Sequence, residues 1–138
     1  MDKRQILAYC NATSPNTLME TLGIEYVDVG DDFIIARMPV TSRVHQPDGI
    51  LHGGATAALA ESIGSVAVFV FNQEPGLVVR GIEITANHVK SVRSGYVFAK
   101  ASPIHLGNTI QFWEIRITDE NDKLVSLCKL TTYKQPKN

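Results

Sequence analysis

The residues best suited to chemistry lie within positions 46–65. They comprise a glutamine, a His-Gly-Gly turn and one carboxylate, that of Glu61. Between Gly53 and Gln73, Glu61 is the only charged side chain in an apolar segment. Burying a lone carboxylate is costly, so its presence indicates either a charge partner or a functional role. The candidate catalytic residues of this stretch are Gln46, His52, Gly53, Glu61 and Ser65.

Helical spacing places small residues around Glu61. Positions three, four and seven apart share one face of a helix, which groups Gly54, Ala57 and Ala58 with Glu61 and Ser65. The small side chains leave room beside the carboxylate, and the serine can hydrogen-bond it or a water molecule. The same spacing also fits close packing, with the glutamate paired to a strand residue. The pattern by itself leaves both interpretations open.

The glycines at the start of this helix suggest a second chemical group. The first turn of a helix has free N–H groups and the positive end of the helix dipole, so the Gly53 N–H can bind a developing oxyanion. Gly53 and Glu61 lie eight residues apart, which is roughly 12 Å along a helix axis. Both groups must come within about 3 Å of the reacting atoms to share one site. If both act together, we expect a two-fold dimer whose antiparallel helices complete each site.

Other polar residues carry weaker signals. His88 shares a strand face with apolar residues, a pattern that a buried structural histidine also fits. Lys90 and Arg93 form the most basic stretch, which indicates either a solvated strand end or a contact to a phosphorylated ligand. The spacing of His, Cys and acidic residues predicts no metal site. The sequence has no G-x-S-x-G, P-loop or dinucleotide-binding motif.

Composition limits the class of protein. A chain of 138 residues with 44% hydrophobic content predicts one globular domain over 1–138. The net charge of −1, with scattered cations, argues against nucleic-acid binding. Cys10 and Cys128 predict reduced thiols rather than a disulfide framework. The start of the sequence lacks the apolar stretch of a signal peptide, and the apolar segment 53–71 contains Glu61, so we expect a cytoplasmic protein that does not span a membrane.

The remaining patterns predict the elements that hold these residues. Two short helices come first, and Ser14-Pro15 is expected to open the second. Apolar, β-branched and aromatic runs predict about six strands. An apolar helix must be covered on most of its faces, so we expect an antiparallel α+β sheet curved around it. The expected helices are 2–12, 15–22 and 53–71, and the expected strands are 24–29, 33–40, 77–90, 95–106, 109–118 and 123–133.

From about Leu22 to Thr132 the chain resembles the hotdog-fold acyl-CoA thioesterases. It is most similar to the PaaI-like group that contains 1,4-dihydroxy-2-naphthoyl-CoA thioesterase and the proofreading thioesterase of enterobactin synthesis. Each motif is weak alone, but their combined order is specific. The resemblance rests on Gln46-Pro47, Leu51-His52-Gly53-Gly54-Ala55, Leu59-Ala60-Glu61-Ser62-Ile63-Gly64-Ser65, Asn87-His88 and His105-Leu106-Gly107.

This resemblance implies a hotdog fold and hydrolysis of an acyl thioester to the free acid and coenzyme A. Glu61 would be the nucleophile or general base, and the Gly53 N–H would polarise the carbonyl. Gln46 would position the carbonyl or the water, His52 would lie near the leaving thiol, and Ser65 would hold the water. His88 would lie near the acyl or pantetheine portion. The expected substrate-binding residues are Gly54, Ser62, His88, Lys90, Arg93, His105 and Gly107.

The resemblance also implies a homodimer with shared sites, usually paired into a homotetramer, and no cofactor beyond the CoA of the substrate. The acyl donor would be an aromatic or aliphatic acyl-CoA, or an acyl- or aryl-carrier protein. Asp48 departs from the group, which tends to have an aromatic residue there, and Val68, Phe69 and Phe71 are bulkier than expected. The alternative functions are a non-catalytic acyl-CoA binding module and a hotdog dehydratase or hydratase. A dehydratase would use His52 as its base.

Overall fold

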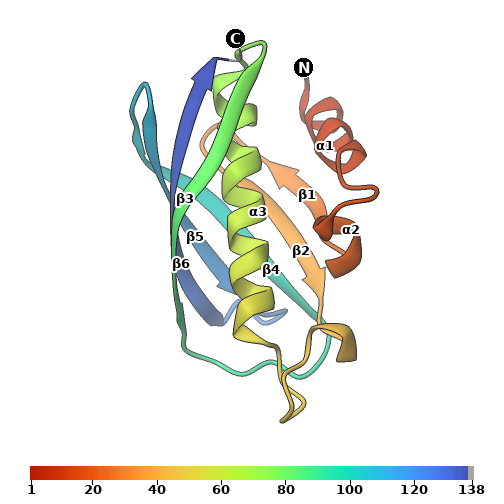
Figure 1. Cartoon of the computed structure of the whole chain (residues 1–138). Helices are drawn as coiled ribbons and strands as arrows, with labels where there is room; N and C mark the ends of the chain where they lie inside the picture. The colour runs from red at the N-terminus through yellow and green to blue at the C-terminus, as the bar shows by residue number, and fades with distance from the viewer. Residues whose placement is uncertain (137–138) are drawn as a thin grey trace.

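The computed structural model describes residues 1–136, in which one antiparallel sheet curves around a long helix (Figure 1). The strands follow one another along the sheet in the order β1-β2-β4-β5-β6-β3, so β1 and β3 form its two edges. This arrangement matches the expected fold class. The elements are α1 (Lys3–Ala12), α2 (Leu18–Leu22), β1 (Glu25–Val29), β2 (Ile34–Pro39), η1 (Ser42–Val44), α3 (Gly53–Asn72), β3 (Leu77–His88), β4 (Tyr96–Leu106), β5 (Ile110–Thr118) and β6 (Leu124–Pro136).

Helix α3 lies across the concave face of the sheet, and one stripe of its surface is buried. The helix begins where the His52 side chain accepts a hydrogen bond from the backbone and ends at Gln73, which adopts a left-handed conformation. Gly64 lies in the buried stripe, where a Cβ atom would stand only 2.5 Å from Leu130 on β6. This glycine therefore allows close contact between helix and sheet. The buried stripe consists of Thr56, Leu59, Ala60, Ile63, Gly64, Ala67 and Val68.

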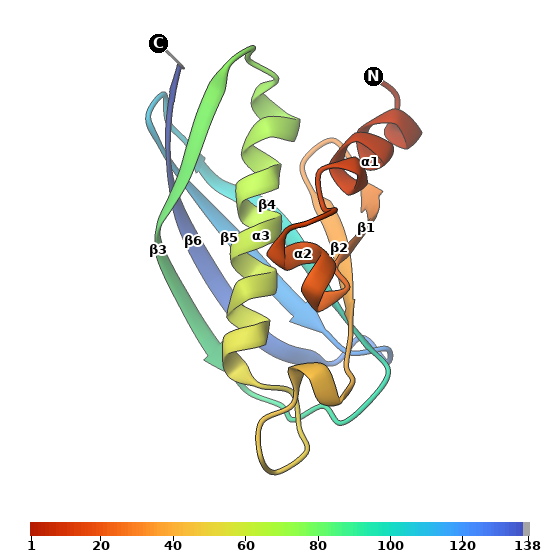
Figure 2. The ribbon, with the colours of Figure 1, turned by 45° about the vertical axis from the view of Figure 1, so that its right-hand side comes forward.

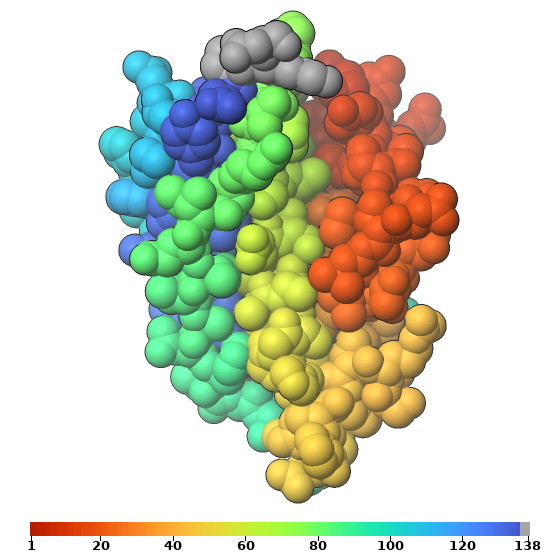
Figure 3. Space-filling model, in the orientation of Figure 1, coloured from red at the N-terminus to blue at the C-terminus, as the bar shows by residue number. Residues whose placement is uncertain are grey.

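The opposite face of α3 is not covered by the sheet. In Figure 3 a strip of the helix is visible between β3 and the N-terminal helices. The expectation that the sheet wraps an all-round apolar helix is therefore only partly fulfilled within one chain. By length and composition alone α3 could cross a membrane, but it packs along the sheet as the core helix of the domain. Glu61 lies outside the buried stripe and is only partly buried.

The N-terminal helices differ from the expected pattern in one detail. Asp2 and Gln5 form a reciprocal capping box that starts α1 close to the expected position. The second helix begins only at Leu18, because the Thr17 hydroxyl accepts a hydrogen bond from Met19 and serves as its cap. The expectation that Ser14-Pro15 opens this helix was wrong. Asn16 has a positive φ of 64°, which interrupts a helical path from the proline.

The two cysteines occupy the expected elements. Cys10 lies on α1 and Cys128 on β6, and both are buried free thiols.

The short 3-10 helix η1 was not expected between Pro39 and His52. Its cap is Thr41, whose hydroxyl accepts from the Arg43 N–H.

The contact at Gly64 predicts the response of the core to a single methyl group. Gly64→Ala should lower the free energy of unfolding by about 1 kcal/mol, because overpacking costs ~1–3 kcal/mol and better helix propensity returns about 1. Urea unfolding measures this difference. Leu130→Val should cost less in the Gly64→Ala protein than in the wild type, since it removes the δ-carbon that the new methyl would meet. A more stable Gly64→Ala protein, or strictly additive losses in the pair, would contradict the contact.

Candidate active site

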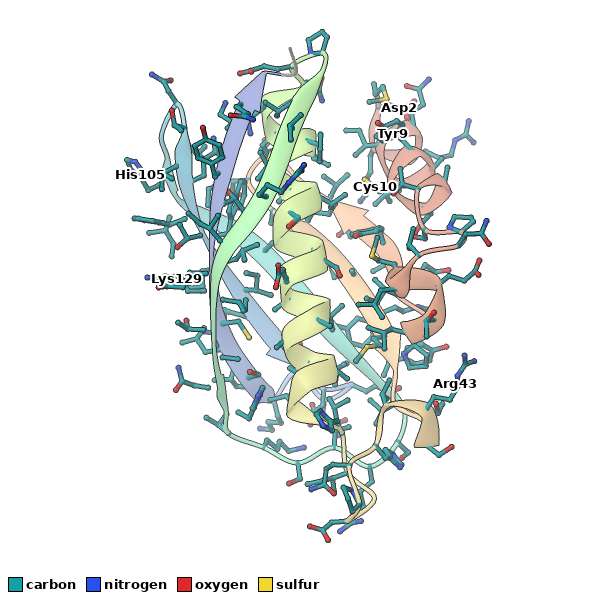
Figure 4. All side chains as sticks on the ribbon, viewed as in Figure 1. Asp2, Tyr9, Cys10, Arg43, His105 and Lys129 are labelled. Carbon is teal, nitrogen blue, oxygen red and sulfur yellow. The ribbon has the colours of Figure 1, made fainter. Side chains whose placement is uncertain are left out.

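A cavity of about 600 Å³ lies between the open strip of α3 and the N-terminal helices. Figure 2 shows α1 and α2 standing beside α3, and Figure 4 marks Tyr9 and Cys10 on α1. The cavity is mainly apolar, and its volume suits a small organic group. Three of the expected site residues, Glu61, Ser62 and Ser65, line it from α3. Its other lining residues include Ile6, Tyr9, Cys10, Met19, Tyr26, Ala58, Val66 and Phe69.

Glu61 is the only carboxylate lining this cavity among residues 1–136. Two other titratable groups there keep their protons at neutral pH. Burial raises the pKa of the Cys10 thiol, and burial together with the nearby Cys10 raises the pKa of the Tyr26 phenol. Cys10 is therefore a poor nucleophile, since the thiolate is the reactive form. The half-buried Glu61 is left as the strongest candidate for chemistry in this cavity.

Gly81 on β3 makes room for the Glu61 carboxylate. A Cβ atom at this position would stand 2.8 Å from Oε2 of Glu61, so any other residue would push against the carboxylate. Gly81 also borders an irregularity in the pairing of β3 with β6. This glycine was not expected to belong to the site. The sequence feature that could have indicated it is a single glycine inside a strand pattern, which marks a bulge or a close approach of the backbone.

A second cavity, of about 400 Å³, lies at the N-terminus of α3. Four of the expected site residues line it: Gln46, Gly53, His88 and Lys90. The His88 ring lies directly over Gly53, where a Cβ atom would be 2.7 Å from Nε2. A glycine at position 53 is thus required by the contact with the histidine, in addition to any approach by a ligand.

His52 has a structural task that the sequence did not reveal. Its Nδ1 accepts a hydrogen bond of 2.7 Å from the Gly54 N–H and so caps α3. Because Nδ1 is the acceptor, the proton of the neutral ring lies on Nε2. This bond occupies the Gly54 N–H, while the exposed His52 ring keeps an Nε2–H that can donate to a ligand.

Gln46 lies in the loop before α3, and its carboxamide is bonded within that loop. Its Oε1 accepts from the backbone N–H of Asp48, and its Nε2 donates to the Asp48 carboxylate at 3.5 Å. Arg93 joins the same loop by donating to the Asp48 carbonyl oxygen at 3.4 Å. Asp48 therefore orients the amide of a candidate catalytic residue.

Lys90 has a charge partner beside the second cavity, whereas His105 and Gly107 lie elsewhere. Lys90 pairs with Asp119, and the hydrogen bond from Lys90 is the main reason that the pKa of this carboxyl falls to about 2. The His105 ring packs against Phe112 in a tilted arrangement, at the β4–β5 hairpin on the side of the molecule away from α1 (Figure 4). Gly107 lies in the same hairpin, against His105. His105 and Gly107 line neither of the two cavities.

The chain does not bring its two sets of polar groups together. Glu61 lines the first cavity and Gly53 the second, and the described residues that line the two cavities do not overlap. The separation agrees with the helix geometry, which puts these residues about 12 Å apart along the axis. Within residues 1–136, no three His, Cys, Asp or Glu side chains gather as a metal site.

Comparison with known proteins identifies the family. Residues 48–126 match the Thioesterase superfamily. The chain belongs to this family. It is 47% identical over 130 residues to the proofreading thioesterase EntH of Cronobacter turicensis, and the alignment covers 94% of each chain. Thioester hydrolysis is therefore its reaction class, as the sequence analysis predicted.

Solved structures support the same assignment. A Haemophilus influenzae thioesterase superimposes with a TM-score of 0.91 at 45% identity, covering 94% of this chain and 90% of that one. The Escherichia coli PaaI protein shares the fold at 20% identity, with a TM-score of 0.84 over 99% and 97% of the two chains. The prediction of a hotdog fold is confirmed.

The contact between Gly81 and Glu61 generates a test. Gly81→Ala should lower the rate of thioester hydrolysis about 10- to 100-fold, because the methyl group displaces the carboxylate by a fraction of an ångström or more. Steady-state thiol release measures the rate. Thr85→Ala, on the same strand, is the control and should keep most of the activity. A fully active Gly81→Ala enzyme would show that the position of this carboxylate does not limit hydrolysis.

Proposed function

We propose that this chain hydrolyses acyl-CoA thioesters to the free acid and coenzyme A. Glu61 acts as the nucleophile or general base, and the Gly53 N–H of the partner subunit binds the oxyanion. The observation that carries this proposal is the half-buried Glu61 carboxylate in a mainly apolar cavity, beside small residues of α3 and a glycine of β3. Once a second chain covers this cavity, such surroundings would remove water from the carboxylate and raise its reactivity.

Both roles of Glu61 give the same balanced reaction. As a nucleophile, the carboxylate attacks the thioester carbon, the C–S bond breaks, and water then hydrolyses the mixed anhydride. As a base, it takes a proton from water, whose oxygen attacks the same carbon. In each case one water is consumed and the sulfur leaves as a thiol. The oxyanion formed on the way needs N–H donors, which the first turn of α3 provides.

A dimer would bring the two halves of the site together. β3 is an edge strand that borders the open strip of α3, and it exposes the apolar Ile82, with the exposed Val89 directly after its end. Pairing this edge with the same edge of a second copy would cover the strip and set the two α3 helices antiparallel. Glu61 of one chain would then face Gly53, Gln46 and His88 of the other. We propose a homodimer of this kind, paired further into a homotetramer.

The two cavities suggest which part of the substrate each of them binds. The apolar cavity of about 600 Å³ suits an aromatic or aliphatic acyl group, with Ser65 near the water. The smaller, more polar cavity suits the thioester carbonyl and the start of the pantetheine arm, with Gln46 in its lining as a donor. The Nε2–H of the exposed His52, at the start of the same helix, is a second donor. The arm is common to CoA and carrier proteins, so a carrier-protein thioester is the second substrate we propose. The reaction needs no cofactor, and we place it in the cytoplasm.

The bonding of His52 weakens the dehydratase alternative. A dehydratase would need this histidine as a base, but its Nδ1 lone pair already accepts from Gly54. Breaking that bond would leave the first turn of α3 without its cap. A non-catalytic binding module remains distinguishable by experiment, since it would bind acyl-CoA without releasing thiol.

The central test compares the wild type with Glu61→Gln on a panel of aromatic and aliphatic acyl-CoAs. We expect free-thiol release to fall about 10²- to 10⁴-fold in the variant, with unchanged circular dichroism, because the amide can neither attack nor accept the proton. Release that persists at the wild-type rate would remove Glu61 from the mechanism. Absence of release by the folded wild type, on CoA and carrier-protein thioesters alike, would favour the binding module.

Shared sites can be tested by mixing inactive chains. Glu61→Gln and Gly53→Pro chains are exchanged into mixed dimers; proline is tolerated in the first turn but removes the N–H, and its Cβ also meets His88. We expect activity to return, since one site of each mixed dimer keeps both intact halves. The control mixes wild type with a chain carrying both changes. If the sites are shared between chains, mixed dimers in this control should be inactive. If each site lies within one chain, the control mixed dimers should be active and the dimers of the two single variants should stay inactive.

A further inference from the structure

Ser126 is a fully buried serine on β6 that lies against His88. Its Oγ donates to the Asn87 carbonyl oxygen at 3.1 Å and lies 3.0 Å from Nδ1 of His88. The same Oγ is 3.4 Å from Sγ of Cys128. No sequence pattern pointed to Ser126, because an isolated serine in a strand carries no signal of its own.

The protons of this cluster fit together in one arrangement. A hydroxyl has a single proton, and a carbonyl oxygen can only accept, so the Ser126 proton lies toward Asn87. The Ser126 oxygen must then accept from His88, which places a proton on Nδ1. It also accepts from the Cys128 thiol, whose pKa is raised by burial, so that the S–H proton is retained. All three contacts are satisfied only when His88 is in its Nδ1–H form.

This arrangement leaves Nε2 of His88 without a proton in the neutral ring. Nε2 faces the start of α3, where it lies close to the Cα of Gly53. Both residues line the smaller cavity, together with Gln46. The cavity therefore holds a hydrogen-bond acceptor beside the peptide N–H that we assign to the oxyanion.

A bound substrate can use this acceptor only through a hydrogen-bond donor of its own. The thioester group has only acceptors, so it cannot use the Nε2 lone pair. The nearest donor in a CoA or carrier-protein thioester is the amide N–H of the pantetheine arm, two carbons from the sulfur. His88 in this tautomer cannot protonate the leaving thiolate through Nε2, which separates its role from that of His52.

We propose that Ser126 is a positioning residue that fixes His88 in the Nδ1–H tautomer, so that Nε2 accepts the pantetheine amide N–H. The substrate part of this inference rests on the proposed thioesterase function. The tautomer part rests on the contacts around Ser126 alone.

The tautomer is tested first, by long-range ¹H–¹⁵N NMR of histidine-labelled protein, with His88 assigned by its loss in His88→Gln. We expect the wild type to show a protonated Nδ1 and an unprotonated Nε2. In Ser126→Ala the partner of Nδ1 is lost, and the Nε2–H form should become populated. An Nε2–H form in the wild type, or an unchanged ring in the variant, would overturn the proposal even if no substrate were turned over.

Kinetics test the substrate contact with two matched thioesters of one acid. One carries N-acetylcysteamine and retains the amide N–H; the other carries the O-acetyl ester of 2-mercaptoethanol and lacks it. We expect the wild type to prefer the amide about three- to tenfold in kcat/KM, chiefly through KM. Ser126→Ala should bring the ratio close to one. An equal ratio in the wild type, or a ratio that survives Ser126→Ala, would overturn the assigned contact.

Control variants separate positioning from packing. Thr132→Val removes another fully buried hydroxyl of β6, one that bonds the Gln111 carbonyl oxygen rather than His88. It should change the free energy of unfolding but leave the substrate ratio and the His88 spectrum intact. Ser126→Cys keeps an acceptor and should restore part of both readouts. If Ser126→Ala fails to fold, the Ser126→Cys variant and the wild-type spectrum still test the proposed tautomer of His88. Failure of the wild type to hydrolyse any thioester would instead count against the proposed function.

Discussion

One sheet can cover only one side of an apolar helix, and most features of this protein follow from that limit. Helix α3 buries a single stripe against the sheet and leaves the opposite strip at the surface of the chain. The N-terminal helices stand beside this strip and enclose a cavity rather than filling it. Glu61 lies on this side of the helix and lines the cavity. The candidate active site is therefore located where the helix is incompletely buried.

Three glycines without turn conformations set how closely the parts approach. Gly64 lets α3 touch β6, Gly81 leaves space for the Glu61 carboxylate, and Gly53 accepts the ring of His88. In each case a methyl group would collide with a particular neighbour at less than 3 Å. The absence of a side chain thus determines the depth of the helix and the position of one catalytic candidate. It also lets the ring of His88 lie against the start of the helix.

The sequence predicted the parts of this structure that arise from regular patterns. Alternation and turn residues located the six strands, and the long apolar run located α3, because these signals are repeated over many residues. The early start expected for α2 was wrong, since the choice between Ser14 and Thr17 as cap depends on one left-handed residue, Asn16. Seven of the twelve expected site residues line the two cavities, while their chemical roles stay predictions. The contacts of Gly81 and Ser126 were missed, because they join distant segments through single atoms.

The proposed dimer would link assembly to reactivity. Covering the open strip of α3 with a second copy removes apolar surface from water, which favours association. The same event would take water from Glu61 and bring it near the N–H donors of the other chain. A carboxylate that is solvated in the separate chain would thus become a reactive group only where an oxyanion site faces it. The helix-length separation of Gly53 from Glu61 then has a chemical consequence: a single folded chain holds both groups yet keeps them apart, and hydrolytic activity should depend on the interface itself.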